Sequence, residues 1–212
     1  MTDIENEELW KEYFYPNTNV FINNYNIMDD ELLKEKEATI SFEKLLELRE
    51  NPINKDSEKE ELNAIHKYVF GELYPWAGEY RKVNMLKSRG TFLHINTSED
   101  IDHYLDRLFQ DANNALETTH SKFEFCEVLA KLYTGLIYCH PYREGNGRSV
   151  REFIREYSIK KSKELNLGTL ELDWSKIDRE ELHKFIEVSH YFPGQTALLF
   201  LGALEPVEIK SK

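Results

Sequence analysis

A helix that is apolar on almost every face sets the strongest limit on how this chain can fold. Residues 122–138 read KFEFCEVLAKLYTGLIY, and apolar side chains recur through the centre at helical spacing. Other elements have to cover such a helix on all sides, because exposing so much apolar surface to water is unfavourable. We therefore expect it to be the core helix of a helical domain. Its predicted inward side carries Phe123, Cys126, Leu129, Ala130, Leu132 and Tyr133.

Further helical patterns occur on both sides of the core helix. Apolar spacing and end signals predict helices at about 30–50, 57–70, 98–109, 148–163, 178–189 and 195–204. The stretch 76–95 differs, because it holds Gly78 and Gly90 together with alternating residues around Val83 and Met85 and then Phe92 and His94. That pattern predicts a short β-hairpin, or flap, with its turn near residues 88–91. The predicted fold is therefore all-α, a helical bundle with one small β-hairpin flap.

Length and composition indicate one soluble globular domain. The chain has 212 residues, which suits a single domain over 1–212 with its core at about 60–205. Residues 1–55 are expected to form an N-terminal segment packed on that core. Hydrophobic residues make up 41% and the formal net charge is −12. This charge argues against nucleic acid or an anionic membrane surface as a general partner.

Two cysteines and the N-terminus bear on the compartment. Cys126 and Cys139 lie in an apolar helical pattern without paired metal-ligand spacing, so we expect two buried free thiols in a reducing compartment. The first residues, MTDIENEEL, are acidic and lack the features of a signal peptide. No apolar run reaches the roughly 18 residues of a membrane span. The expectation is a cytoplasmic protein, or one delivered into another cell if it is an effector.

A polar run follows the core helix and reads CHPYREGNGRSVREFIR at residues 139–155. The run Gly145–Asn146–Gly147 offers flexible backbone at the start of a helix, where successive N–H groups can form an anion nest. Arg148 and Arg151 are three residues apart, so they share a helix face and can clamp a polyphosphate. Arg155 continues that face further along the helix. The run therefore indicates a site for an anionic, phosphate-containing ligand.

Two more residues of the run suit phosphate chemistry. Glu144 would be repelled by phosphates in the nest unless a hard cation such as Mg²⁺ lies between them. His140 can act as a general base toward a hydroxyl that attacks a nucleotide phosphate. Taken singly, the histidine reads as a helix cap, the G-N-G as a turn and the arginines as a solvated face. Their occurrence together within twelve residues favours a site.

The run strongly resembles the signature of the Fic-domain family, H-x-F-x-[D/E]-G-N-[G/K]-R-x-x-R. Here it reads H-P-Y-R-E-G-N-G-R-S-V-R, with Tyr142 where the family usually has Phe. That aromatic residue packs inward, so we expect Tyr142 to be buried with a partner for its hydroxyl. The resemblance covers most of the chain. It includes Tyr15-Pro16 followed by NTNVFINN, YPWAGEYR at 74–81 and KSRGTF at 87–92.

This resemblance implies a helical bundle with a hairpin flap, and transfer of AMP from ATP to a Tyr, Thr or Ser hydroxyl of a target protein. Pyrophosphate is then the leaving group, His140 the general base and Glu144 the ligand of Mg²⁺. The flap at about 84–93, with Lys87 and Ser88, is expected to register the target segment by strand addition. The residues at the family's nucleotide-binding positions are Gly145, Asn146, Gly147, Arg148 and Arg151. The adenine site is expected near the helix at 178–189.

Many family members are restrained by a helix with the pattern [S/T]-x-x-x-E-[G/N], whose glutamate pairs with the last arginine of the motif, here Arg151. Glu-Gly occurs in this chain only at 144–145 and Glu-Asn only at 5–6 and 50–51, and none has Ser or Thr four residues before the glutamate. The chain therefore resembles toxins held by a separate antitoxin that carries the inhibitory glutamate. An unrestrained protein, or a fragment of a longer one, stays open.

Two other functions also stay open. The first is transfer of another phosphate-containing group, namely UMP, phosphocholine or a γ-phosphate, although Gly147 argues against the last, since γ-phosphate-transferring relatives tend to lack the second glycine. The second is a nucleotide-binding docking module without catalysis, against which the intact His140 and Glu144 speak.

Overall fold

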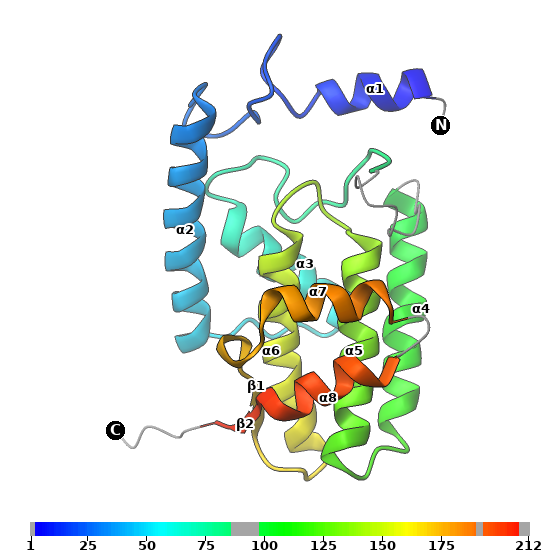
Figure 1. The fold of residues 1–212 in the computed structure, drawn as a ribbon. Coiled ribbons are helices and arrows are strands. Elements are labelled where there is room, and N and C mark those ends of the chain that lie inside the picture. Colours follow the sequence, from blue (N-terminus) through cyan, green and yellow to red (C-terminus); the bar gives the residue numbers. More distant parts are fainter. Residues whose placement is uncertain (1–2, 86–97, 190–192, 208–212) are drawn as a thin grey trace. The chain divides into compact units, whose positions relative to one another are not determined.

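The computed structural model describes residues 3–85, 98–189 and 193–207. Within these ranges the chain forms eight α-helices, one short 3-10 helix and two short strands (Figure 1). The predicted all-α fold class is confirmed. The helices are α1 (Asp3–Lys11), α2 (Asp30–Glu50), α3 (Glu58–Phe70), α4 (Ser98–Leu116), α5 (Lys122–Cys139), α6 (Asn146–Glu164), α7 (Arg179–Glu187) and α8 (Pro193–Ala203).

The helix ends follow the capping residues of the sequence. Asp29 precedes α2, and its side chain accepts a hydrogen bond from the Leu32 N–H. Ser57 caps α3 in the same way through the Glu60 N–H. Such caps satisfy backbone donors that have no partner inside the helix. Every helix predicted from the periodicity is present, whereas α1 lies in a segment for which the sequence indicates no regular structure.

The chain divides into two compact units, of which the first comprises Met1–Tyr104 and Cys139–Ser149. It contains α1, α2, α3 and the polar loop after α5. Helix α2 packs against α3, and the Tyr68 hydroxyl of α3 donates to Glu47 of α2 at 2.5 Å. The core side chains of these two helices are Leu33, Ile40, Leu48, Leu62, Ile65, Val69 and Phe70.

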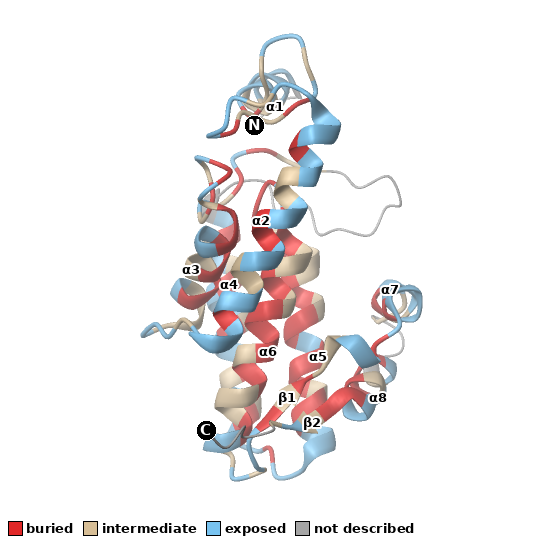
Figure 2. Ribbon diagram, turned by 90° about the vertical axis from the view of Figure 1, so that its left-hand side faces the viewer, coloured by how far each residue is buried: buried red, intermediate tan, exposed pale blue. Residues whose placement is uncertain are grey.

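The second unit comprises Leu105–Tyr138 and Val150–Lys212. Most of α5 is buried, as its red colour in Figure 2 shows, so the prediction of a core helix is confirmed. Gly135 allows α4 to approach α5 closely, because a Cβ there would lie 2.6 Å from Leu108 Cδ1. One detail of the prediction was wrong: Phe123 is 38% exposed. It belongs to the first turn of α5, where the helix is not yet surrounded.

A two-stranded antiparallel sheet closes the second unit. Strand β1 (Leu170–Leu172) pairs with β2 (Leu204–Pro206), with Glu171 opposite Glu205. The α6 serines Ser158 and Ser162 accept the N–H groups of Leu172 and Leu170 at 3.0 and 2.9 Å. Helix α6 is thereby tied to the sheet, which the sequence did not predict.

The predicted flap lies mostly in residues 86–97, outside the described residues, and so do Lys87 and Ser88. Both cysteines are buried free thiols, as expected, and burial raises the pKa of each to about 12. None of the helices in the described ranges has both the length and the apolar character that crossing a membrane requires.

Candidate active site

A buried arginine fixes the turn that carries the candidate base. His140 directly follows α5 with a φ of +47°, in the left-handed region, so the chain turns sharply there. The Arg81 side chain donates to the backbone carbonyls of His140 at 2.8 Å and Cys139 at 3.2 Å. The Arg81 N–H donates to the Pro141 carbonyl at 2.8 Å. Because carbonyls at a helix C-terminus lack partners inside the helix, Arg81 both caps α5 and sets the position of His140.

Tyr142 anchors the loop from inside. Its side chain is fully buried, and its hydroxyl donates to Asn63 Oδ1 at 2.6 Å, as expected for a Tyr in place of Phe in the motif. The ring stacks on His66 of α3, with 3.8 Å between ring centroids.

His66 is the second anchor of the loop, and its protonation state is fixed. Its Nδ1 accepts the Gly78 N–H at 2.8 Å, so the proton is on Nε2, which donates to the Glu144 carbonyl at 2.9 Å. The pKa of His66 is lowered to about 4, chiefly because the ring is buried. The bond to the Glu144 carbonyl raises the pKa in part, and the charge of Arg148 lowers it. The neutral imidazole therefore joins the Gly78 turn to the motif loop.

Asn146 closes the loop onto the start of α6. Its Oδ1 accepts the Tyr142 N–H at 2.8 Å, and its Nδ2 donates to the Tyr142 carbonyl at 2.7 Å. Helix α6 begins at Asn146, two residues before the predicted start at about 148. Because the Asn146 side chain is bonded to Tyr142, a phosphate would meet the backbone N–H groups of the first turn instead, including that of Gly147.

The backbone conformation and the close packing of the loop require a glycine at position 145. It has a φ of +80°, and a Cβ at this position would lie 2.4 Å from Cε2 of the Phe70 ring. The close approach places the loop directly on α3. No other residue type fits here without strain, which gives the glycine of the motif a steric reason.

Glu144 precedes Gly145 in the same loop. Its side chain is 47% exposed. One carboxylate oxygen accepts the Gly145 N–H at 2.9 Å, and Arg148 Nη2 lies 4.0 Å from it. An exposed carboxylate next to a helix N-terminus fits a hard cation such as Mg²⁺ that is shared with phosphate oxygens. Among residues 3–85, 98–189 and 193–207, no cluster of three or more His, Cys, Asp or Glu could hold a metal alone.

Arg143, the variable position before Glu144, is held by an aromatic cage. Its guanidinium lies 3.9 Å from the centroid of the Trp10 ring and 4.7 Å from that of Phe21. Phe14 lies on the same group at 5.3 Å. Cation–π contacts of this kind attach the N-terminal segment to the motif loop.

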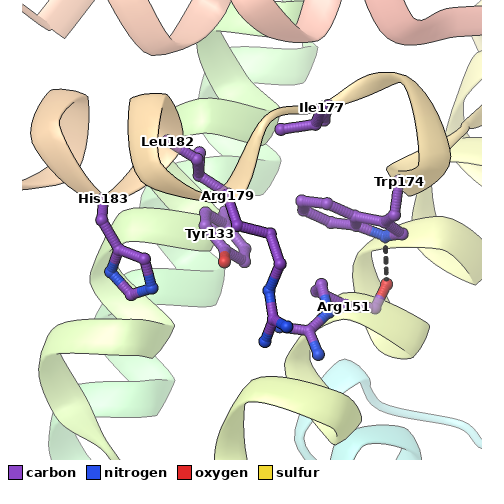
Figure 3. Close-up of a pocket in the computed structure, with 7 residues that line it drawn as sticks. All are labelled: Tyr133, Arg151, Trp174, Ile177, Arg179, Leu182 and His183. Atoms are coloured by element: carbon purple, nitrogen blue, oxygen red, sulfur yellow. Dashed lines mark hydrogen bonds between the residues drawn. The ribbon is translucent and has the colours of Figure 1, made fainter.

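The second motif arginine, Arg151, lines a cavity of about 230 Å³ in the second unit (Figure 3). The Trp174 indole N–H donates to the Arg151 carbonyl at 2.8 Å. Tyr133 lines the same cavity. Figure 3 shows the guanidinium groups of Arg151 and Arg179 extending into the same space, with His183 nearby. Converging cations repel one another, so the cavity favours an anionic ligand. Ile177 and Leu182 complete the lining.

Arg155 does not extend the candidate site. It is 6% exposed and forms ion pairs with Glu152 at 2.8 Å and Glu171 at 3.4 Å, and it also pairs with Glu156. These carboxylates occupy its donors, so its role is structural.

Several residues around the motif loop and around the Arg151 cavity were not predicted from the sequence. Around the loop they are Glu37, Ser41, His66, Tyr74, Arg81 and Arg143. Around the cavity they are Tyr133, Trp174, Arg179 and His183. One signal was readable for His66: it follows Ile65 on the buried face of α3, where a histidine needs partners for both ring nitrogens. The aromatic residues near the N-terminus gave no sign of what they cover.

Comparison with known proteins agrees with this geometry. A model of the Fic/DOC family matches residues 56–158. The probable protein adenylyltransferase y4lH of Sinorhizobium fredii is 31% identical over 162 residues, which covers 74% of this chain and 80% of that protein. The chain belongs to the Fic/DOC family.

Two further comparisons place this Fic/DOC chain among its relatives. It is 28% identical over 180 residues to the protein adenylyltransferase VbhT of Bartonella schoenbuchensis, covering 84% of this chain but 36% of VbhT. The chain thus spans about a third of that relative's length. The crystal structure of BepC, a VirB-translocated effector protein from Bartonella tribocorum, with bound AMPPNP has a TM-score of 0.75 at 22% identity, covering 93% of this chain and 98% of that one. The Fic fold is therefore established.

Proposed function

We propose that this Fic/DOC chain is a protein adenylyltransferase, which transfers AMP from ATP to a Tyr, Thr or Ser hydroxyl of a target protein. The observation that carries the proposal is the complete motif from His140 to Arg151. The loop at its start is held in the first unit by Arg81 and His66. Two relatives support the proposal, namely VbhT, which is named a protein adenylyltransferase, and y4lH, which is named a probable one. The products are an AMP–protein phosphodiester and pyrophosphate.

The residues of the loop divide the reaction between them. His140 accepts the proton of the target hydroxyl as its oxygen attacks the α-phosphorus, and the bond from that phosphorus to the bridging oxygen of pyrophosphate breaks. The first-turn N–H groups of α6 and the Arg148 guanidinium stabilise the charge on the phosphate oxygens. Glu144 would hold Mg²⁺, which neutralises charge on the phosphates when it is bound.

The cavity beside Arg151 suits the base and the phosphate oxygens of a nucleotide. Trp174 and Leu182 offer apolar surface to a base, while Arg151 and Arg179 attract phosphate oxygens. Three residues of this cavity, Arg179, Leu182 and His183, come from α7, which lies in the range 178–189 where the sequence places the adenine site.

The proposal also covers how the target protein is held and how a separate antitoxin would inhibit the enzyme. Lys87 and Ser88 of the flap would hold the target segment by strand addition. A separate antitoxin that carries an inhibitory glutamate would engage Arg151, as in a toxin–antitoxin pair, and the cytoplasm would be the site of action. The likeness to BepC, which is a translocated effector, supports the alternative of delivery into another cell.

A labelling experiment tests the proposal. The purified chain is incubated with host lysate, Mg²⁺ and ATP that carries the label on either the α- or the γ-phosphate. We expect protein-bound label only from the α-labelled ATP, none with His140→Ala, and a matching AMP adduct by mass spectrometry. Protein-bound label from the γ-phosphate would instead indicate kinase chemistry. A complete lack of labelling, with ATP binding demonstrated, would contradict the proposal.

A further inference from the structure

Arg148, the first motif arginine, is held by a helix outside the family motif. Its Nη2 lies 2.5 Å from Glu37 Oε1, and its Nη1 donates to Ser41 Oγ at 2.9 Å. Glu37 and Ser41 are four residues apart on α2, so they share one helix face. The matching family model starts at residue 56, after α2 has ended. The contacts of Arg148 with Glu37 and Ser41 thus come from α2, outside the matched region.

Glu37 is itself immobilised. The Tyr74 hydroxyl donates to its second carboxylate oxygen, and the Tyr74 side chain is 2% exposed. Burial raises the pKa of Tyr74 well above its usual value, and the neighbouring Glu37 charge adds to the effect, so this hydroxyl remains a donor. Both oxygens of Glu37 therefore have fixed partners, on a side chain that is only 16% exposed.

The Arg148 guanidinium is also held on one face, because its Cζ lies 4.7 Å from the centroid of the Phe70 ring. A guanidinium has five N–H donors, and the contacts with Glu37 and Ser41 use two of its nitrogens. The plane is thereby set while donors remain for an anion. The same Phe70 ring lies under Gly145, so Arg148 and the phosphate-binding turn rest on one side chain.

We propose that Glu37, fixed by Tyr74 and assisted by Ser41, is a positioning residue that orients Arg148 toward the nucleotide phosphates. The inference rests on the proposed function, since it assigns a partner to one of that site's ligands. An arginine on a flexible stem loses rotamer entropy when it binds phosphate, and a fixed carboxylate partner removes that loss in advance.

Nucleotide affinity measured by calorimetry tests this directly, with AMPPNP and Mg²⁺ as the probe and the full chain as the protein. Glu37→Gln keeps the shape but removes the charge that holds Arg148, and we expect the Kd to rise about 10-fold, the equivalent of about 1.4 kcal/mol. Tyr74→Phe removes only the hydroxyl and should raise the Kd about 3-fold. Glu43→Gln is the matched control, because Glu43 is an exposed glutamate on the same helix and its loss should leave the Kd unchanged.

The double variant shows whether Glu37 acts through Arg148. In an Arg148→Ala background, Glu37→Gln should add no further loss of affinity, because the group that it positions is gone. An equal loss in both backgrounds would overturn the proposal. Tighter binding by Glu37→Gln would also overturn it, since Glu37 would then compete with phosphate for Arg148.

Failures of the two proposals can be told apart. A wild-type chain that binds AMPPNP but transfers no AMP refutes the proposed function, while the Kd series still tests the positioning role. A wild-type chain that binds no AMPPNP overturns both. If Glu37→Gln does not fold, Tyr74→Phe carries the test, and a wild-type Kd for that variant contradicts the proposal.

Discussion

The neutral, buried His66 makes the stability of this protein depend on pH in a way that one substitution can isolate. Its folded-state pKa is about 4, against the usual value near 6.5, because the ring is completely buried. Protonation would place a proton on Nδ1, where the Gly78 N–H now donates. The charged ring would also face Arg148, whose charge already lowers the pKa of His66.

The direction of the effect follows from proton linkage. Between pH 4 and pH 6.5 the unfolded chain binds the His66 proton and the folded chain does not. The contribution of the neutral ring is therefore fully present above about pH 6.5 and is lost as the pH falls toward 4. Between pH 7 and pH 5 the free energy of unfolding should decrease by about 2 kcal/mol from this residue alone.

Urea titrations at a series of pH values measure this, with His66→Gln as the reference. Glutamine keeps one acceptor and one donor at this position but cannot take up a proton. The variant should be less stable than the wild type at pH 7, and the gap should narrow by about 2 kcal/mol at pH 5. A gap that stays constant across this range would refute the assignment of a neutral His66 with a lowered pKa.

Three further substitutions test the frame around the motif. In Gly145→Ala the new Cβ would lie 2.4 Å from the Phe70 ring at a positive φ, so the unfolding free energy in urea should fall by about 2–4 kcal/mol; a smaller loss in a Phe70→Leu background would confirm the clash. Arg81→Met removes the donors to the Cys139 and His140 carbonyls, so the free energy of unfolding should fall by about 3 kcal/mol. The rate of AMP transfer should fall more than the affinity for AMPPNP. Equal losses of transfer rate and affinity would argue against a role of Arg81 at the candidate base. Trp10→Leu removes the ring 3.9 Å from the Arg143 guanidinium, and thermal unfolding should show a loss of about 1 kcal/mol, whereas an unchanged Tm would mean that this contact contributes nothing.

Most helices were predictable from their apolar spacing, and α2, α3 and α7 also begin at capping residues. The core helix α5 shows this clearly, since its apolar faces require burial whatever surrounds them. The strands β1 and β2 were not predictable, because residues 170–172 pair with 204–206 and no local pattern announces a three-residue pairing over that distance. Helix α1 was missed because its nine residues have little apolar periodicity to signal a helix.

Some residues of the candidate site were predictable from the sequence and others were not. His140, Glu144, Gly145, Asn146, Gly147, Arg148 and Arg151 lie within twelve residues, so their chemistry and helical spacing could be read along the chain. Glu37 was detectable only as a charged residue on the inward face of α2, near Leu33, Ile40 and Ser41. Periodicity shows that such a residue points inward, but not which side chain it meets.

The sequence by itself determined the helical class, the reacting groups of the motif and the likeness to the Fic-domain family, because all of these depend on residues close together in the chain. Only the tertiary structure decided that Glu37 pairs with Arg148, that Arg81 caps α5 and that the His66 ring is neutral. The partners of Arg148 and Arg81 in these contacts lie 111 and 59 positions away along the chain. Their geometry depends on how helices pack within a few tenths of an ångström, which no local pattern encodes.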